Sequence, residues 1–343
     1  MLKEKEKPWK SQKSDFTEAL RYLRGRKAGT ITSLKTPWLK FDDAGAAGIE
    51  WQSTVVVGGR SGTGKTLLKD QMVRESFALN PGENIRVLDF ELEMVGTKSV
   101  IREFCSITGK SYTEMLTELT NEDIAICDNY VIERLKYPID VVEKSPTVKD
   151  FEKIIRQYMD FHSFEEAVRK THKDESSGVI TETTEKLKKY KKTIISLDHT
   201  ILLKRAPGES VQEMLYHLGE TLTQLKREYP VIFIILSQLN RDIEKAERME
   251  NGKQGNYVSE GDFFGSDAML QHADLLVGMN RPAKYNITQY GPNRYVIHNK
   301  NVMAIHFLKL RNGEPRLSFF EIQPTTMTFK EIPTPIMHTP KKI

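Results

Sequence analysis

The residues from Gly58 to Thr66, GGRSGTGKT, constrain this chain more than any other stretch. From Gly59 onward they read G-x-x-x-x-G-K-T, the pattern of a phosphate-binding loop (P-loop). An apolar β-branched run at 53–57 precedes the loop, and apolar residues recur at helical spacing over 67–73. Glycines let backbone N–H groups turn inward toward phosphate oxygens, and the helix that follows adds its partial positive charge. Strand, glycine loop and helix in this order predict a nucleotide site rather than an accidental glycine-rich turn.

Each residue of this loop has an expected role. Lys65 is expected to reach the β- and γ-phosphates, and the Thr66 hydroxyl to bind Mg²⁺. The residues expected to bind the nucleotide are Gly59, Arg60, Ser61, Gly62, Thr63, Gly64, Lys65 and Thr66.

The composition is that of an ordinary globular protein. Of 343 residues, 38% are hydrophobic and 29% charged, which suits one large core or two domains. No apolar run reaches the length of a membrane span, and the lysine-rich N-terminus lacks the apolar centre of a signal peptide. We therefore expect a cytoplasmic protein with no membrane partner. Cys105 and Cys127 lack metal-ligand spacing and are expected to be reduced thiols. The net charge of +4 is compatible with a nucleic-acid partner but does not establish one.

Strands and helices alternate along the chain. Strands are expected at 53–57, 85–90, 138–142, 193–199, 231–236, 273–279, 295–298, 302–310 and 316–322. Helices are expected at 15–24, after the P-loop, and at 96–108, 111–119, 121–136, 148–159, 209–227 and near 267–271. The continuous apolar strands predict an α/β fold, a mostly parallel twisted sheet with helices on both faces. Asn312-Gly313 predicts a hairpin between the last two strands.

The expected domain organisation follows from composition. The chain is expected to divide into a flexible basic N-terminus (1–14), a helix and lead-in (15–52), the nucleotide-binding domain (53–322) and a flexible tail (323–343). The first helix, 15–24, is expected to be capped by Asp15 and ended by Gly25.

Two polar stretches interrupt the nucleotide-binding domain. Residues 161–192 are highly charged and are expected to be a partly helical excursion from the core that ends in a basic cluster, 186–192. The polar, glycine-containing loop at 242–261 is expected to be mobile.

Three polar residues end predicted strands on the rim where ligands of such sheets bind: Glu93, Asp198 and Gln238. Asp198 fits a carboxylate that holds Mg²⁺ through water, unless it only caps its strand. Glu93 fits the group that polarises the attacking water, because its strand should lie close to the P-loop strand. Glu91, two residues earlier on the same face, competes for that role. Gln238 fits a sensor of the γ-phosphate that passes its state to the next loop, or an amide that only satisfies the strand end.

Lys309 and Arg311 lie two residues apart on one predicted strand, so both project to one face. Such cations are solvated or anchor a surface acid in many proteins. Alternatively, they form an arginine finger that is presented to the nucleotide of a neighbouring subunit.

The motifs GRSGTGKT, FELEM, ISLDHTILLKRAPG, LSQLNR, GSDAMLQHADLLVGMNRP and KLRNG occur in this order. Together they resemble the motor domain of the DnaB-type replicative helicases, and the resemblance covers residues 15–322. It implies a RecA-like P-loop NTPase core with a C-terminal β-hairpin extension, using ATP and Mg²⁺. The residues that match the motifs of this family are Lys65 and Thr66 (phosphate and magnesium), Glu93 (catalytic glutamate), Asp198 (second acidic motif), Gln238 (glutamine switch), and Lys309 and Arg311 (the K-x-R-x-G finger).

The resemblance also implies a function and partners. The family members are ATP-dependent replicative DNA helicases, so we expect a homo-oligomer, a hexamer, that translocates 5′–3′ on single-stranded DNA. A primase, a loader or another replisome protein is an expected partner, in a bacterial cell or a phage-infected host. Two loops that face the ring channel would fall at 204–208 and within 242–261. The residues expected there to bind DNA are Lys204, Arg205 and Gly208, and Arg102 is expected near the nucleotide base.

Three departures from the family pattern are visible. About 50 residues precede the P-loop, too few for the family's helical N-terminal domain, and helix 15–24 matches its linker helix, which docks on the neighbouring subunit. Glu91 stands where the family usually has serine, and 161–192 is longer than expected, so it is a candidate for binding a partner or loader. A RecA-like recombinase or filament ATPase and a protein that uses ATP only as a switch ligand remain as alternative functions.

Overall fold

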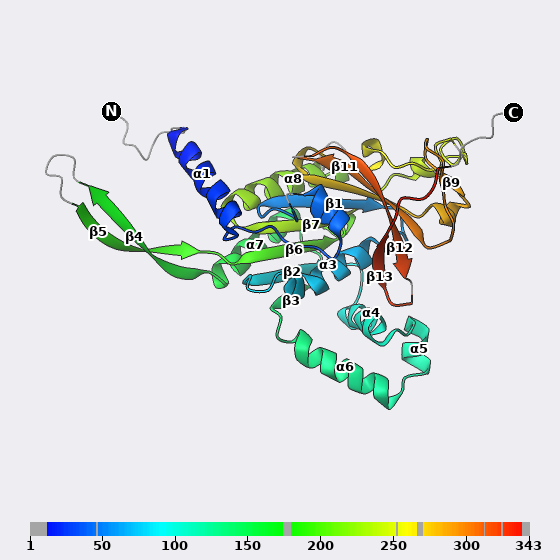
Figure 1. The fold of residues 1–343 in the computed structure, drawn as a ribbon, viewed down its shortest axis with the longest axis horizontal. Helices are drawn as coiled ribbons and strands as arrows, with labels where there is room; N and C mark the ends of the chain where they lie inside the picture. Colours follow the sequence, from blue (N-terminus) through cyan, green and yellow to red (C-terminus); the bar gives the residue numbers. More distant parts are fainter. Residues whose placement is uncertain are drawn as a thin grey trace.

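The computed structural model describes residues 12–45, 47–173, 180–251, 253–265, 270–311, 313–323 and 325–337. Its main sheet is formed by β1 (Ser53–Gly59), β2 (Ile85–Glu91), β3 (Ile139–Val142), β6 (Lys192–Asp198), β7 (Val231–Gln238), β8 (Leu275–Asn280), β11 (Val302–Leu310), β12 (Arg316–Gln323) and β13 (Thr328–Ile332). Two small sheets pair β4 (Phe164–Lys173) with β5 (Ile180–Lys189), and β9 (Gln289–Tyr290) with β10 (Tyr295–Val296). The main sheet has nine strands in the order β13-β12-β11-β8-β1-β7-β6-β2-β3 (Figure 1).

The helices are α1 (Lys13–Ala28), α2 (Leu39–Ala44), α3 (Lys65–Leu79), α4 (Gly96–Thr108), α5 (Tyr112–Thr117), α6 (Asn121–Arg134), α7 (Val148–Phe161) and α8 (Val211–Glu228). Short 3₁₀ helices are η2 (Thr200–Leu202), η3 (Arg241–Glu244), η4 (Glu260–Asp262) and η5 (Pro282–Tyr285). No helix in the described ranges is both long and apolar enough to cross a membrane.

Six neighbouring strands, from β8 to β3, run parallel, and β11, β12 and β13 continue the sheet antiparallel at one edge. Side chains of β1 alternate between two cores because successive residues point to opposite faces. Val56 packs into a core with α7 and α8, whereas Val55 and Val57 pack into a second core with α2 and α3. The predicted α/β fold with helices on both faces is confirmed.

The first helix is longer than the sequence predicts. α1 continues past Gly25 and ends at Gly29, which adopts a left-handed φ of 72°. Gly25 therefore does not end the helix, and Asp15 lies in its first turn rather than at its cap. None of the residues of α1 is buried, and Phe16 and Leu23 are 64% and 62% exposed. The apolar stripe of this helix lies uncovered on the single chain.

Helices α4, α5 and α6 form a small unit beside the sheet (Figure 1). Capping boxes begin α5 at Ser111 and α6 at Thr120, where each side chain accepts a bond from the third helical N–H. Cys105 and Cys127 are both buried free thiols in the core of this unit, as the lack of metal-ligand spacing predicts.

The charged insertion forms a β-ribbon instead of the predicted partly helical segment. β4 and β5 pair antiparallel from Phe164↔Lys189 to Lys173↔Ile180 and project away from the body (Figure 1). The ribbon is rich in Val, Thr and Ile, which favour strands, and its charges show no helical periodicity to oppose that preference. The basic cluster is largely neutralised within the chain: Lys186 pairs with Glu165 at 3.2 Å and Lys188 with Asp160 at 2.6 Å.

The predicted flexible tail contains the edge strand β13. Phe329 is buried, its N–H donates to the Gln71 side chain at 2.6 Å, and its carbonyl accepts from the Trp38 indole at 3.1 Å. Tertiary contacts therefore order a segment whose own sequence lacks periodicity. Within the predicted mobile loop, Arg248 and Asp262 form an ion pair at 2.9 Å. Asn312 of the predicted turn and most of the helix expected near 267–271 lie outside the described residues.

Candidate active site

The P-loop lies at the carboxyl rim of the sheet, between its two neighbouring strands. Gly59 at the end of β1 pairs with Gln238 of β7 and Met279 of β8. Gly62 and Gly64 have φ of 74° and 86°, values that residues with a Cβ rarely adopt, so these glycines permit the turn into α3. The loop thus lies at the amino end of α3, where N–H groups and the helix dipole favour an anion.

Lys65 is folded back onto the loop. Its Nζ donates to the carbonyl oxygens of Gly59 at 2.8 Å and Arg60 at 3.3 Å. Burial lowers the pKa of Lys65, and the charges of Asp198 and Glu93 partly offset this effect. A buried cation held only by carbonyl dipoles can exchange these partners for phosphate oxygens.

Thr66 and Asp198 meet across the top of α3 and β6. The Thr66 hydroxyl donates to Oδ2 of Asp198 at 2.6 Å, and Asp198 is fully buried. Its second oxygen, Oδ1, is buried without a hydrogen-bond partner among the described residues. A hydroxyl and a carboxylate with a free oxygen are the hard ligands that a hydrated Mg²⁺ takes, so these residues fit the predicted ion.

Gln238, Glu93 and a third side chain, His199, surround the space beside Lys65. Nε2 of His199 lies 3.3 Å from Nε2 of Gln238 and 3.9 Å from Oε2 of Glu93. The Glu93 side chain is 55% exposed, whereas that of His199 is 10% exposed. Burial lowers the pKa of His199, which favours a neutral ring. Sequence reasoning missed His199, although an imidazole directly after a strand-ending aspartate was a visible signal.

The strand that precedes Glu93 does not lie next to the P-loop strand, so the expected neighbourhood of these strands was wrong. Two strands, β7 and β6, separate β2 from the P-loop strand β1. Glu93 approaches the P-loop because it lies beyond the end of β2, in the chain segment after Glu91. Leu92 donates its N–H to the Asp198 carbonyl at 3.1 Å, which holds this segment against β6.

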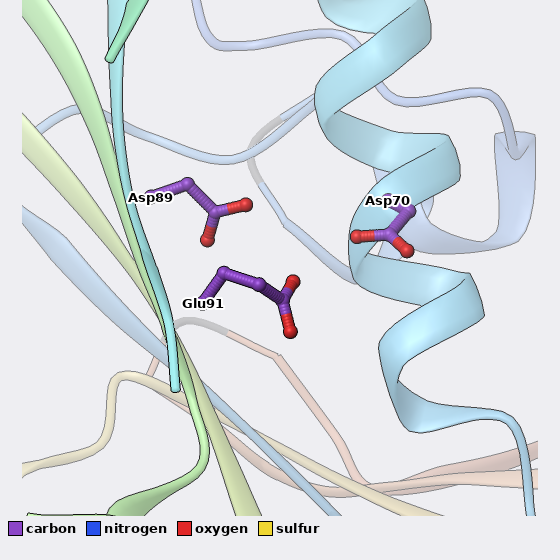
Figure 2. Close-up of side chains that lie close together, drawn as sticks. All are labelled: Asp70, Asp89 and Glu91. Carbon is purple, nitrogen blue, oxygen red and sulfur yellow. The ribbon is translucent and has the colours of Figure 1, made fainter. Parts of the chain in front are cut away.

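Glu91, the competing candidate, belongs to a different cluster. Glu91 and Asp89 of β2 point toward Asp70 of α3 (Figure 2). The ammonium of Lys69, which is fully buried, lies 2.9 Å from Glu91, 3.0 Å from Asp89 and 3.1 Å from Asp70. This cation occupies the centre where a metal ion would bind. Burial raises the pKa of Glu91 to about 7 and that of Asp70 to about 6.

The side chain of Arg60 faces away from the phosphate cradle. It forms a bidentate ion pair with Glu244 of η3 at 2.8 and 3.1 Å and donates to the Leu239 carbonyl at 2.9 Å. The next residue, Ser61, accepts a bond from Lys284 of η5 at 2.6 Å. Sequence reasoning identified neither Glu244 nor Lys284. No hydrogen bond or ion pair joins Arg102 of α4 to the P-loop in the part of the chain that the structure describes.

Lys309 and Arg311 lie at the opposite edge of the sheet. Leu310, between them, pairs with Leu275 at the start of β8, whereas the P-loop follows the end of β1, level with the end of β8. Arg311 is 67% exposed and pairs with Asp274 at 3.0 Å, and Lys309 donates to the Leu270 carbonyl. The structure therefore does not bring these two cations to the P-loop of their own chain.

The three predicted DNA-binding residues lie on the loop between β6 and α8. Lys204 and Arg205 are exposed, and Gly208 has a φ of 81°. The loop forms an open concave surface lined by Lys204, Arg205, Ala206, Gly208, Glu209 and Ser210. Lys204 is anchored by its backbone N–H, which donates to the Pro146 carbonyl at 2.8 Å.

Known proteins share this fold and sequence pattern. A family model described as the DnaB-like helicase C terminal domain matches residues 141–331. The replicative DNA helicase DnaB of Geobacillus stearothermophilus is 24% identical over 294 residues, 83% of this chain and 53% of that protein, so this chain spans about half the length of that relative.

Solved structures give the same fold. The isolated ATPase domain of a DnaB-like helicase superposes with a TM-score of 0.72 at 17% identity, over 94% of this chain and 99% of that one. A DnaB-like replicative helicase, whose structure was described with its interactions with primase, gives 0.69 at 16% identity over 95% and 68%. The main sheet is therefore that of a RecA-like ATPase domain. Because the family match includes β6, whose Asp198 meets the P-loop threonine, and extends over more than half of the chain, this protein belongs to the family of DnaB-like helicase C-terminal domains.

Proposed function

We propose that this chain is the ATPase motor of a replicative DNA helicase. It would hydrolyse ATP at the interfaces of a homo-oligomeric ring and move along single-stranded DNA to unwind duplex. The observation that carries this proposal is the contact between Thr66 and Asp198 at 2.6 Å beside Lys65, with one oxygen of Asp198 left free. This arrangement suits a magnesium triphosphate held against the amino end of α3.

The roles of the residues follow from their positions. Lys65 leaves the carbonyls of Gly59 and Arg60 and binds the β- and γ-phosphates. Thr66 and Asp198 would hold Mg²⁺, which when bound neutralises phosphate charge. Glu93, whose exposed carboxylate has no hydrogen bond among the described residues, orients the attacking water and accepts its proton. Gln238, whose backbone pairs with Gly59 of the P-loop, senses the γ-phosphate.

Arg311 is proposed to act on the nucleotide of the adjacent subunit. Four residues of β8 separate its level, at Leu275, from the level of Gly59, at Met279, which is about 13 Å at the rise of a strand. An exposed guanidinium so far from its own P-loop is suited to a site formed by two copies of the chain. Head-to-tail contacts of this kind close into a ring or continue as a helix. A hexamer is the expected closed form.

Single-stranded DNA is the proposed track. Lys204 and Arg205 would contact its phosphates, and backbone amides near Gly208 would assist. α1, with its uncovered apolar stripe, would dock on the neighbouring subunit. Translocation polarity of 5′–3′ and a primase or loader as partner are parts of the same proposal.

The decisive experiment measures ATP hydrolysis with and without single-stranded DNA, together with displacement on a forked duplex. We expect DNA-stimulated hydrolysis and ATP-dependent displacement, both lost in Lys65→Ala. Strand exchange without displacement would instead favour a RecA-like recombinase. Hydrolysis that DNA leaves unchanged would favour a protein that uses ATP as a switch ligand.

A further inference from the structure

We propose that His199 is a positioning residue that links Gln238 to Glu93 through a single nitrogen atom, Nε2. The inference rests on the proposed function, because it assigns a role within the same hydrolysis site. The sequence motifs assign no role to His199, and its neighbours are visible only when β2, β6 and β7 are brought together.

The two neighbours of Nε2 compete for it. The 3.3 Å contact with Gln238 lies within hydrogen-bonding distance, whereas the 3.9 Å separation from Glu93 is too long for a hydrogen bond. One neutral imidazole nitrogen is either a donor or an acceptor and makes one good bond at a time. In this structure the nitrogen is therefore engaged by Gln238, and Glu93 is left without a hydrogen bond among the described residues.

A small movement exchanges the partners. Gln238 pairs with Gly59 through its backbone, so the same strand end touches the P-loop and the imidazole. When the Gln238 amide turns to a γ-phosphate, Nε2 is released. It then becomes a donor to Glu93, whose exposed carboxylate is free to close the remaining gap, about 1 Å beyond hydrogen-bonding distance. Glu93 is thereby oriented toward water only when nucleotide is present.

The surroundings hold the ring in place for this exchange. His199 is 8% exposed and follows Asp198, which is fully buried and bonded to Thr66. Its other nitrogen, Nδ1, is buried without a partner among the described residues. Nε2 is therefore the atom through which this ring acts on its neighbours, and a substitution that keeps only that atom's position should keep the function.

Two matched substitutions test this assignment. The amide of glutamine in His199→Gln reaches the position of Nε2, whereas that of asparagine in His199→Asn reaches only the position of Nδ1. For DNA-stimulated ATP hydrolysis, we expect His199→Gln to keep kcat within about 3-fold and His199→Asn to lower it by at least about 10-fold, within the range that general-base catalysis contributes. KM for ATP and the Kd of a fluorescent ATP analogue should change by less than about 2-fold in both variants, because the P-loop is untouched.

A double-mutant cycle gives a readout that a purely structural role would not move. In a Glu93→Gln background, His199→Asn should cause little further loss, because the imidazole acts through that carboxylate. Equal kcat in the Gln and Asn variants, or additive losses in the cycle, would overturn the inference while wild-type activity still supported the proposed function. A wild-type protein without DNA-stimulated hydrolysis would overturn both.

Discussion

Replacing Glu91 by glutamine should stabilise the protein in a pH-dependent way. Glu91 is 3% exposed, and its Oε1 has no hydrogen-bond partner among the described residues. Burial raises its pKa from 4.5 to about 7, against the attraction of Lys69. Near neutral pH the cluster in Figure 2 therefore holds more carboxylate charge than its one buried lysine can neutralise.

The sign and size of the effect follow from linkage. Between pH 4.5 and about 7, the folded state binds the proton of Glu91 more tightly than the unfolded state, so this contribution to stability is lost as pH rises through that window. A shift from 4.5 to about 7 corresponds to about 3 kcal/mol, at about 1.4 kcal/mol per pKa unit. Glutamine imitates the protonated carboxyl and still accepts a bond from Lys69. The Glu91→Gln variant should thus gain about 3 kcal/mol over wild type at pH 8 and almost nothing at pH 4.5.

Urea unfolding at pH 5, 6, 7 and 8 measures this difference directly. Glu118→Gln, which changes an exposed glutamate on the adjoining helical unit, is the matched control and should change stability little at any of these pH values. The raised pKa of Asp70, about 6, should leave some pH dependence in the Glu91 variant. A Glu91→Gln protein that is less stable than wild type at pH 8, or equally shifted at every pH, would refute the reasoning.

Four further substitutions test the proposed site. Lys65→Ala should abolish hydrolysis in every assembly state, measured as phosphate release; residual turnover above about 1% of wild type would contradict its role. Arg311→Ala should keep the Kd for ATP and lower kcat by about 10³-fold, and mixing it with Lys65→Ala subunits should restore some turnover if the finger acts in trans. Lys204→Ala and Arg205→Ala should each weaken binding to single-stranded DNA and lower the slope of log K against log salt by about 0.7, measured by fluorescence anisotropy; an unchanged slope would exclude a phosphate contact.

Local sequence pattern was sufficient to identify the nucleotide site. A P-loop is a contiguous segment whose glycines, lysine and threonine act through their own backbone and immediate neighbours, so the consecutive residues from Gly58 to Thr66 reveal it. Asp198 and Gln238 were identifiable because parallel strands end on one rim, whichever order the strands take. The order itself was not readable, and the assumption that β2 lies close to β1 was wrong.

Contacts between distant segments decided the features that sequence reasoning missed. Phe329 forms part of β13 because Gln71 and Trp38, far earlier in the chain, bond its backbone. In the same way, Arg60 turns to Glu244, 184 residues away, a partner that no spacing rule indicates.

The sequence by itself determined a phosphate-binding α/β domain of the helicase type, because the glycine loop and the apolar strands are specified by neighbouring residues. Only the tertiary structure decided which polar groups meet around the phosphate cradle. His199 reaches both Gln238 and Glu93, and Arg311 lies at the far edge of the sheet, because strand order and register place these side chains. Such long-range placement depends on packing the whole sheet, which no local pattern encodes.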